Sequence, residues 1–184
     1  MTQNWSSYES PFGRLTLIGS EAGLRELHFP GRAPALDRVD RDDGAFREVR
    51  GQLEEYFAGE RKAFDLALDV SGTELQRRVW RALQALPFGS VTTYGELARE
   101  LGVPDSPRRT GTGERTVSAP QKVGWAIGST PTPIVIPCHR VVGADGSLTG
   151  YRGGLRRKRA LLDFEAALVG RAGFWTHQGQ LSLL

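Results

Sequence analysis

Apolar and polar residues alternate over much of the first thirty positions, a pattern typical of β-strands. The alternation is clearest over 15–17 and 27–29, which predicts two strands joined by a turn at 19–23. The apolar spacing then becomes helical and predicts a helix over 45–57. One more short strand is expected over 64–68, so the pattern predicts a small α/β unit at the start of the chain.

Helical periodicity dominates the second half of the chain. The helices that it predicts cover residues 73–86, 94–101, 119–127 and 155–168. A Pro-Phe-Gly sequence ends the first helix, Thr92 or Thr93 can cap the second, and Ser118 can cap the third. Two short helices in a basic region suggest a helix-turn-helix, although the connection between them is long for that motif.

Two segments between these helices lack periodicity. Residues 103–118 hold two prolines, two glycines and three arginines, and are expected to form an irregular loop. Residues 130–137 hold three prolines, which exclude a helix and predict a rigid extended run. The chain is therefore expected to comprise an N-terminal domain, a helical domain and a tail, over residues 1–70, 71–170 and 171–184.

Composition narrows the class of protein. With 184 residues, of which 39% are hydrophobic and 24% charged, the chain has the make-up of a folded globular protein. It is too short for a multi-module assembly. No apolar run approaches the ~20 residues of a membrane helix, and the first ten residues resemble no export signal, so a cytoplasmic location is expected.

Charge is distributed unevenly along the chain. Residues 1–70 hold 9 Arg and Lys against 13 Asp and Glu, whereas residues 71–184 hold 15 against 8. A basic part joined to an acidic support is typical of a polyanion-binding module. An arginine-rich solubilising surface would give the same numbers, so charge alone leaves nucleic-acid binding and simple solubility open.

Cys138 is the only cysteine, which excludes an internal disulfide and a cysteine-rich zinc site. It abuts His139 and Arg140, and positive charge with a nearby base favours a reactive thiolate. Glu165 lies on a helix that can fold back to orient the imidazole. A buried, inert cysteine is the alternative for this residue taken alone. Three histidines and one cysteine make a poor ligand set, so no metal or other cofactor is expected.

Four sequence motifs surround this cysteine. They are Phe88-Gly89-x-Val91-x-x-Tyr94-x-x-Leu97-Ala98, Pro131-x-Pro133-Ile134-x-Ile136, Pro137-Cys138-His139-Arg140-Val141 and Gly150-Tyr151-x-Gly153-Gly154-Leu155. Together they resemble the O6-alkylguanine-DNA alkyltransferase family, also called methylated-DNA–protein-cysteine methyltransferases. The resemblance covers nearly the whole chain. It implies a ribonuclease H-like α/β unit, with a small β-sheet and a helix, followed by a mainly α domain of winged helix-turn-helix type.

The resemblance implies direct DNA repair. Members of this family flip an O6-alkylated guanine out of duplex DNA and move the alkyl group to their own cysteine in a single turnover. By position, Cys138 resembles the acceptor, His139 the base that takes its proton through a water, and Glu165 the carboxylate that orients the imidazole. Tyr94 resembles the tyrosine that helps to rotate the phosphate and assists the departing guanine.

The same resemblance implies a set of DNA- and base-binding residues. These are Gln121, Lys122, Trp125, Thr130, Arg140, Val141, Val142, Tyr151, Arg152 and Gly153. The second helix of the motif is expected to enter the minor groove, with phosphate contacts that do not depend on base sequence. The expected partner is duplex DNA that carries O6-alkylguanine, with O4-alkylthymine as a further candidate lesion. The protein is expected to be a nucleoid-associated monomer.

Three positions of the DNA-reading helix depart from the family pattern. Gln121 stands where the family has an intercalating arginine, Thr130 where it has an asparagine, and Trp125 where it has a small residue. Trp125 is expected either to fill the core or to narrow the groove contact. Compensating DNA contacts are expected from arginines of the long loop, namely Arg108, Arg109 and Arg115.

Other functions remain open at this point. A non-catalytic alkyltransferase-like protein would recognise alkylated DNA without transfer, although members of that class usually lack the cysteine. A transferase specialised for bulkier adducts and a regulator switched by alkylation of Cys138 are two more alternatives. A thiol hydrolase is the last, and no oxyanion-hole motif accompanies the cysteine.

Overall fold

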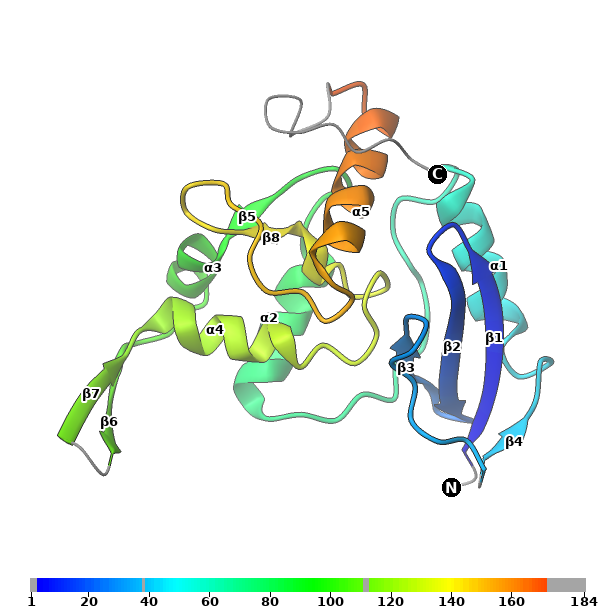
Figure 1. The fold of residues 1–184 in the computed structure, drawn as a ribbon, viewed down its shortest axis with the longest axis horizontal. Helices are drawn as coiled ribbons and strands as arrows, with labels where there is room; N and C mark the ends of the chain where they lie inside the picture. Colours follow the sequence, from blue (N-terminus) through cyan, green and yellow to red (C-terminus); the bar gives the residue numbers. More distant parts are fainter. Residues whose placement is uncertain (1–2, 38, 111–112, 172–184) are drawn as a thin grey trace.

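A sheet with one helix forms one end of the molecule, and a cluster of helices forms the other (Figure 1). The computed structural model describes residues 3–37, 39–110 and 113–171, with backbone only for 108–110 and 113–114. Apart from its first residue, the tail expected over 171–184 lies outside the described residues. None of the helices in the described part of the chain is long and apolar enough to cross a membrane.

The N-terminal unit is a four-stranded sheet in the order β3-β2-β1-β4. Strands β1 (Asn4–Ser10), β2 (Gly13–Ser20) and β3 (Gly23–His28) are antiparallel neighbours, and the short β4 (Asp40–Arg41) runs parallel to β1. Helix α1 (Arg47–Phe57) packs on one face of this sheet. The two predicted strands, the turn between them and the helix are thereby confirmed.

The alternation of apolar and polar residues in β2 matches an alternation of buried and more exposed side chains. Leu15 and Leu17 are fully buried and Thr16 between them is only half-buried, because successive side chains of a strand point to opposite faces. Opposite them, α1 buries Leu53 and Tyr56, which lie three positions apart on one helical face. The resulting apolar cluster forms the core of the N-terminal unit and continues into the C-terminal unit.

The prediction of a strand over 64–68 was wrong. This segment forms one isolated parallel bridge, between Leu68 and Leu24 of β3. Leu24 makes both backbone bonds, donating to the carbonyl of Ala67 at 2.9 Å and accepting from Asp69 at 3.0 Å. A single residue of β3 thus holds the segment along the edge of the sheet, and no ladder extends from it.

The C-terminal unit is mainly helical, as expected. Its elements are α2 (Glu74–Ala85), β5 (Thr92–Thr93), α3 (Tyr94–Glu100), α4 (Ala119–Gly128), the 3₁₀ turn η1 (Cys138–Arg140), β8 (Val141–Val142) and α5 (Leu155–Leu168). Thr73 caps α2, and Thr93 rather than Thr92 caps α3, each in a reciprocal capping box with a Gln or Glu three positions on. Strands β5 and β8 pair in parallel and join the entrance of α3 to the segment after η1.

The irregular loop predicted over 103–118 is instead a β-hairpin. Strands β6 (Ser106–Thr110) and β7 (Gly113–Val117) pair antiparallel, with Arg108 opposite Arg115, and the hairpin projects beyond the start of α4 (Figure 1). Its sequence is polar or charged at nearly every position, so no apolar face revealed a period of two. Backbone hydrogen bonds between the two strands form this element, and such bonds do not depend on the residue types from which a strand is predicted.

The two units share an apolar contact. Tyr56 of α1 packs its ring against Phe88 and Phe164 of the C-terminal unit, with ring centroids 6.0 and 5.6 Å apart. A backbone bond of 2.9 Å from Leu27 of β3 to the carbonyl of Pro131 adds a second junction. The N-terminal unit is therefore in contact with the segment that leads to the cysteine.

Candidate active site

Cys138 lies at the start of η1, directly after a tight bend of the chain. The run over 130–137 is bent rather than extended as predicted, because Ile136 donates to the carbonyl of Thr132 at 2.9 Å. Ile134, at the bend, has a φ of 77°, which is an uncommon, strained conformation for a β-branched residue. Its side chain is buried in the core, and this packing holds the bend that presents the thiol.

His139 and Glu165 form a buried pair beside the cysteine. Nε2 of His139 lies 2.9 Å from Oε1 of Glu165, and both side chains are almost fully buried. Since the carboxylate can only accept, the neutral imidazole carries its proton on Nε2. Among the described residues, Nδ1 of His139 is a buried atom without a hydrogen-bond partner. The ring is thus oriented with a free acceptor, as a general base requires.

Five hydrogen bonds converge on the Glu165 carboxylate. Besides His139, the donors are the Tyr56 hydroxyl at 2.8 Å, Nε and Nη2 of Arg140 at 2.8 Å each, and the Gly89 backbone N–H at 3.1 Å. Burial by itself raises the pKa of this carboxyl, but His139 and Arg140 more than offset it and hold the pKa well below its usual range. Glu165 therefore stays ionised.

The thiol of Cys138 is only 3% exposed. Burial raises its pKa to about 11, while the Thr130 side chain, hydrogen-bonded to it, and the charge of Lys158 favour the thiolate. Burial likewise lowers the pKa of His139, against the opposing pull of Glu165. Near neutral pH the site therefore holds a thiol beside a neutral imidazole, and the thiol must lose its proton during the reaction.

Lys158 belongs to the site, although no sequence pattern indicated it. Its side chain is fully buried, and burial lowers its pKa to about 8. Its Nζ donates to the Thr149 carbonyl at 2.7 Å and lies 5.9 Å from the centre of the Tyr94 ring. Within the described part of the chain, no carboxylate forms an ion pair with this ammonium group, whose charge favours the Cys138 thiolate. Only the folded position of α5 distinguishes it.

Tyr94 and Tyr151 close the site from the other sides. The Tyr94 hydroxyl donates to the Thr149 carbonyl at 3.2 Å, and its ring faces Gly124 of α4. Tyr151 packs on Phe29 with ring centroids 6.0 Å apart, and its buried hydroxyl has no partner among the described residues. A Cβ at Gly153 would lie 2.6 Å from both aromatic rings, so only glycine fits beneath them.

Four residues expected at the DNA are buried instead. Arg140 is bound to Glu165 and to the Leu86 carbonyl at 2.7 Å. Its charge is therefore neutralised inside the protein and is not available to a DNA phosphate. Val141 and Val142 are buried in β8, where only backbone groups at the edge could contact a base. Thr130 is buried as well and donates to the Ile127 carbonyl at 2.7 Å, which ties the end of α4 to the thiol.

The remaining expected residues whose side chains are described lie at or near the surface. Gln121 and Trp125 are exposed on α4, Arg152 is exposed after the glycine-rich turn, and Arg115 is exposed on β7. Lys122 is half-buried, with its Nζ donating to the Pro104 carbonyl. For Arg108 and Arg109 the backbone register is described but the side chains are not. The structure thus separates a buried reaction centre from an outer face on α4 and the hairpin.

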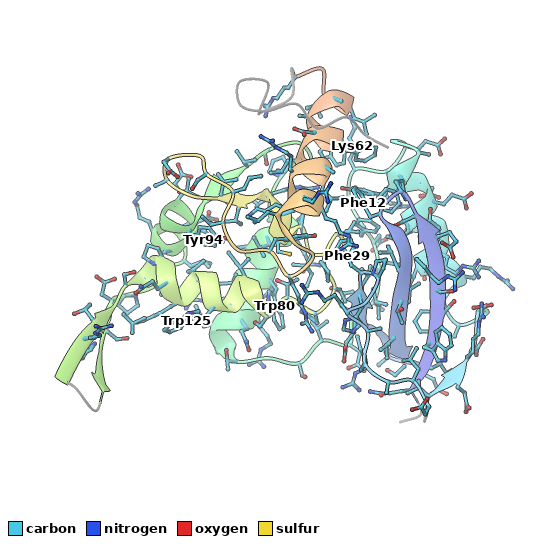
Figure 2. The ribbon with its side chains drawn as sticks, viewed as in Figure 1. Phe12, Phe29, Lys62, Trp80, Tyr94 and Trp125 are labelled. Carbon is cyan, nitrogen blue, oxygen red and sulfur yellow. The ribbon has the colours of Figure 1, made fainter. Side chains whose placement is uncertain are left out.

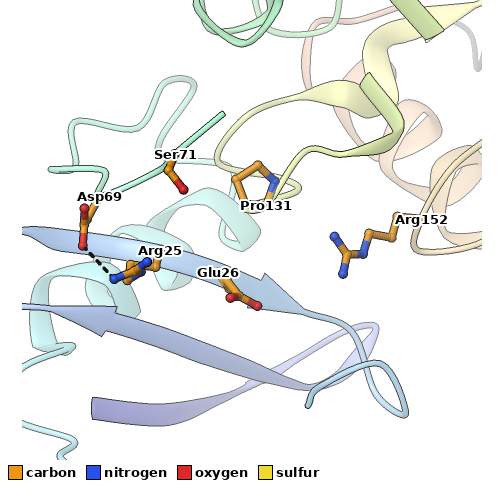
Figure 3. Close-up of a pocket in the computed structure, with 6 residues that line it drawn as sticks. All are labelled: Arg25, Glu26, Asp69, Ser71, Pro131 and Arg152. Carbon is orange, nitrogen blue, oxygen red and sulfur yellow. Dashed lines mark ion pairs between the residues drawn. The ribbon is translucent and has the colours of Figure 1, made fainter. Parts of the chain in front are cut away.

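A cavity of about 230 Å³ lies apart from the thiol, at the junction of the two units (Figure 3). Its lining consists of Arg25, Glu26, Asp69, Ser71, Pro131 and Arg152. Arg25 and Asp69 are ion-paired there at 3.5 Å. None of the reaction-centre residues His139, Glu165, Lys158 and Cys138 lines this cavity. Among the described residues, no cluster of His, Cys, Asp or Glu is suited to bind a metal ion.

The fold and the site are those of a protein with a cysteine nucleophile. The buried cysteine and its oriented histidine lie next to the pair of helices α3 and α4. Family models agree with this description. The model of the 6-O-methylguanine DNA methyltransferase ribonuclease-like domain matches residues 4–70, and that of the DNA-binding domain matches residues 74–167. The chain therefore belongs to the O6-methylguanine-DNA methyltransferase family.

Individual relatives are similar in sequence to this chain over most of their length. The chain is 42% identical to the methylated-DNA–protein-cysteine methyltransferase of Mycobacterium bovis over 164 residues, 88% of this chain and 92% of that protein. It is 40% identical to the protein of the same name from Methanosarcina acetivorans, over 89% and 98%. The Mycobacterium tuberculosis protein OGT, solved in complex with DNA, is 41% identical, with a TM-score of 0.76 over 91% of this chain and 94% of that one.

The Glu165 pair yields a stability prediction. Glu165→Gln leaves the buried Arg140 charge without its counterion, and breaking a buried pair on one side typically costs about 3–5 kcal/mol. We expect a loss of that order in the free energy of unfolding, measured by guanidinium denaturation. Asp163→Asn, on the same helix and half-buried, is the matched control, with an expected loss of about 0.5 kcal/mol or less. Equal losses in the two variants would contradict the assigned role.

Proposed function

We propose that this protein repairs DNA directly, by moving an alkyl group from O6 of guanine in duplex DNA to Sγ of Cys138. The observation that carries the proposal is the oriented His139 beside the thiol, with its free Nδ1 and the ionised Glu165 behind it. The names of the relatives, and the DNA in the solved complex of the M. tuberculosis protein, support the same activity. Catalysis of this type needs neither metal nor cofactor.

The chemical step is a displacement at the alkyl carbon. The Cys138 thiol gives its proton through a water to Nδ1 of His139, and the sulfur attacks the carbon in line with the C–O6 bond. The S–C bond forms as the C–O6 bond breaks, and the electron pair of that bond remains on the guanine. The Tyr94 hydroxyl turns from the Thr149 carbonyl to donate a hydrogen bond to the departing base. Guanine takes up one proton from water and the imidazolium later returns one to water, so the balance closes. Glu165 stabilises the imidazolium that forms.

The product explains why the protein acts once. A thioether on Cys138 offers no leaving group that water or a second base could displace at neutral pH. Cys138 is the only cysteine of the chain, so no second thiol can resolve the adduct. Each molecule therefore removes one lesion, and reactivity is best kept low until a substrate arrives. The thiol pKa of about 11 in the DNA-free protein fits that need.

Access to the thiol requires an extrahelical base. Extrusion costs a few kcal/mol, and less for a lesion that pairs badly. We place the flipped base against Tyr151 and the Gly153 turn, with backbone groups of Val141 and Val142 at its edge. On the DNA side, Gln121, Lys122, Trp125 and Arg152 contact the duplex from α4 and the turn. Three further points stay predictions. They are the preference between methyl and bulkier groups, the acceptance of O4-alkylthymine as a substrate, and the monomeric state of the protein.

The first test is the intact mass of the protein after incubation with excess duplex oligonucleotide carrying one O6-methylguanine. We expect a gain of one methyl group per chain, which peptide mapping locates on Cys138, and none in Cys138→Ala. Methyl removal by Cys138→Ala would refute the nucleophile. Binding of the lesion without any mass change would favour the non-catalytic alkyltransferase-like alternative or a larger adduct.

The role of His139 predicts a change in pH dependence. With a thiol pKa of about 11, roughly one Cys138 in 10⁴ is ionised at pH 7 without help. His139→Gln keeps a donor for Glu165 but lacks a base, so we expect the single-turnover rate at pH 7 to fall about 100-fold or more. Because the thiol ionises further as pH rises, the variant regains about tenfold per pH unit toward pH 9.

The wild-type protein is the control for this profile. Its rate should fall at acidic pH, below the usual histidine range, because burial lowers the pKa of His139. Loss of the Lys158 charge above pH 8 lowers the rates of both proteins alike, so the readout is the ratio of the variant rate to the wild-type rate, which should rise about tenfold per pH unit. Stopped or quenched single-turnover assays measure both profiles. Parallel profiles for variant and wild type would show that His139 is not the base.

We also propose that the β6–β7 hairpin contacts DNA phosphates. Arg108, Arg109 and Arg115 lie on its two strands, and each phosphate contact contributes about 0.9 to the slope of log affinity against log salt. Ser106 and Val117 face each other in the ladder, so two glycines can replace residues 107–116 and keep Asp105, which accepts from the Ala119 N–H at 2.6 Å. We expect about tenfold weaker binding of unmodified duplex at 0.1 M salt, and a slope smaller by about 2.7 if all three arginines contact phosphates.

A charge-only variant is the control for the hairpin. The triple substitution of Arg108, Arg109 and Arg115 by Gln retains the ladder and should reproduce the change in slope. Fluorescence anisotropy over a range of salt concentrations measures both variants. Unchanged affinity and slope after removal of the hairpin would rule out its contact with DNA.

A further inference from the structure

The outer face of α4 carries one large apolar side chain in contact with solvent. Gln121, Trp125 and Gly128 are exposed and lie four and three positions apart, which places them on one helical face. Trp125 is 57% exposed, the largest exposure among the large hydrophobic side chains that the structure describes (Figure 2). It is therefore not a core residue, and a partner that covered the indole would gain the free energy of removing its apolar surface from water.

The orientation of α4 is fixed by its inner face. Val123, Ala126 and Ile127 are buried, and the indole N–H of Trp80 on α2 donates to the Ala126 carbonyl at 3.0 Å. Gln76, also on α2, donates to the Ser129 hydroxyl at 2.7 Å at the end of the helix. The helix cannot roll to bury Trp125 without breaking these bonds, so the exposure of the indole is built into the packing.

Gln121 is less free than its exposure suggests. Its side-chain oxygen accepts the Ser118 backbone N–H at 3.0 Å and so completes the capping box at the start of α4. Moving this amide into DNA would leave the N–H of the N-cap residue Ser118 without its partner. Of the two long side chains on the outer face, Trp125 is the one that can contact a partner at no cost to the helix.

The surroundings of Trp125 fit a nucleic acid. Helix α4 contains one lysine, Lys122, and no acidic residue, and the arginine-bearing hairpin adjoins its start. An aromatic side chain beside basic residues is the combination with which proteins contact bases and phosphates together. DNA offers phosphates to the basic residues and sugar and base surfaces to the indole, so one partner matches both.

We propose that Trp125 is the wedge of this protein, an apolar side chain that enters the DNA groove and packs on sugar and base. The inference rests on the proposed function, in which α4 faces the duplex. One helical turn, about 6 Å, separates Trp125 from Gln121, so the indole reaches the base pairs next to the one that Gln121 faces. The contact is neutral. It releases no counterions, and its contribution to affinity does not depend on salt.

The test compares Trp125→Ala, Trp125→Phe and Gln121→Ala in binding to unmodified duplex DNA, by fluorescence anisotropy at several salt concentrations. We expect Trp125→Ala to weaken binding about tenfold at every salt concentration, with an unchanged slope of log affinity against log salt. Trp125→Phe should retain most of the affinity, and Gln121→Ala should lose less than threefold. Leu168→Ala, which truncates a 40% exposed leucine at the end of α5, is the matched control and should bind as the wild type does.

Three outcomes would overturn the proposal. They are a loss below twofold in Trp125→Ala, a changed salt slope in that variant, and a larger loss in Gln121→Ala than in Trp125→Ala. Sedimentation tests the competing occupant, because a dimer that Trp125→Ala dissociates would make this face an interface between copies. The mass assay separates the two levels of proposal. Methyl transfer with unaltered DNA binding in Trp125→Ala would reject the wedge alone, whereas no transfer by the wild type would reject the proposed function.

Discussion

The ionised carboxylate of Glu165 is the group on which the architecture depends. A buried charge is tolerated only when donors surround it, and here they come from α1, from the turn before β5 and from η1, which supplies both His139 and Arg140. Tyr56 is the donor from the N-terminal unit, so the acidic α/β unit is more than a support. It completes the shell of the carboxylate that orients His139, and the two units must assemble before the site exists.

Charge in the site is divided between two cations with different tasks. Arg140 neutralises Glu165 and so stabilises the folded protein, which explains why it is buried rather than at the surface. Lys158 donates to a carbonyl and lies close to the thiol, and its depressed pKa measures the cost of keeping that charge inside. Because the Arg140 charge is compensated locally, Lys158 is the ammonium that favours a thiolate on Cys138. The protein thus carries an unfavourable charge at the place where negative charge develops.

The sequence predicted what depends on periodicity and motif. Patterns visible in the sequence alone predicted the helices and the strands around Leu15 and Leu27. They also predicted the thiol and the histidine beside it. The hairpin was missed because its ladder is made of backbone, and the bend at Ile134 because prolines exclude a helix without prescribing an extended chain. Lys158 was missed since its burial comes from the docking of α5. Single residues at a site depend on tertiary contacts, which spacing does not encode.

Helix α4 connects the outer face to the reaction centre through side chains that are small or buried. Gly124, next to Trp125 in the chain, lies against the Tyr94 ring, where a Cβ would lie 3.7 Å from the ring carbons. Thr130, after the last turn, caps the helix and hydrogen-bonds to Cys138. A partner that fixes α4 at Trp125 therefore also fixes the tyrosine and the thiol. Recognition and chemistry share one rigid element, and a substitution on its outer face acts on both only if the helix itself moves.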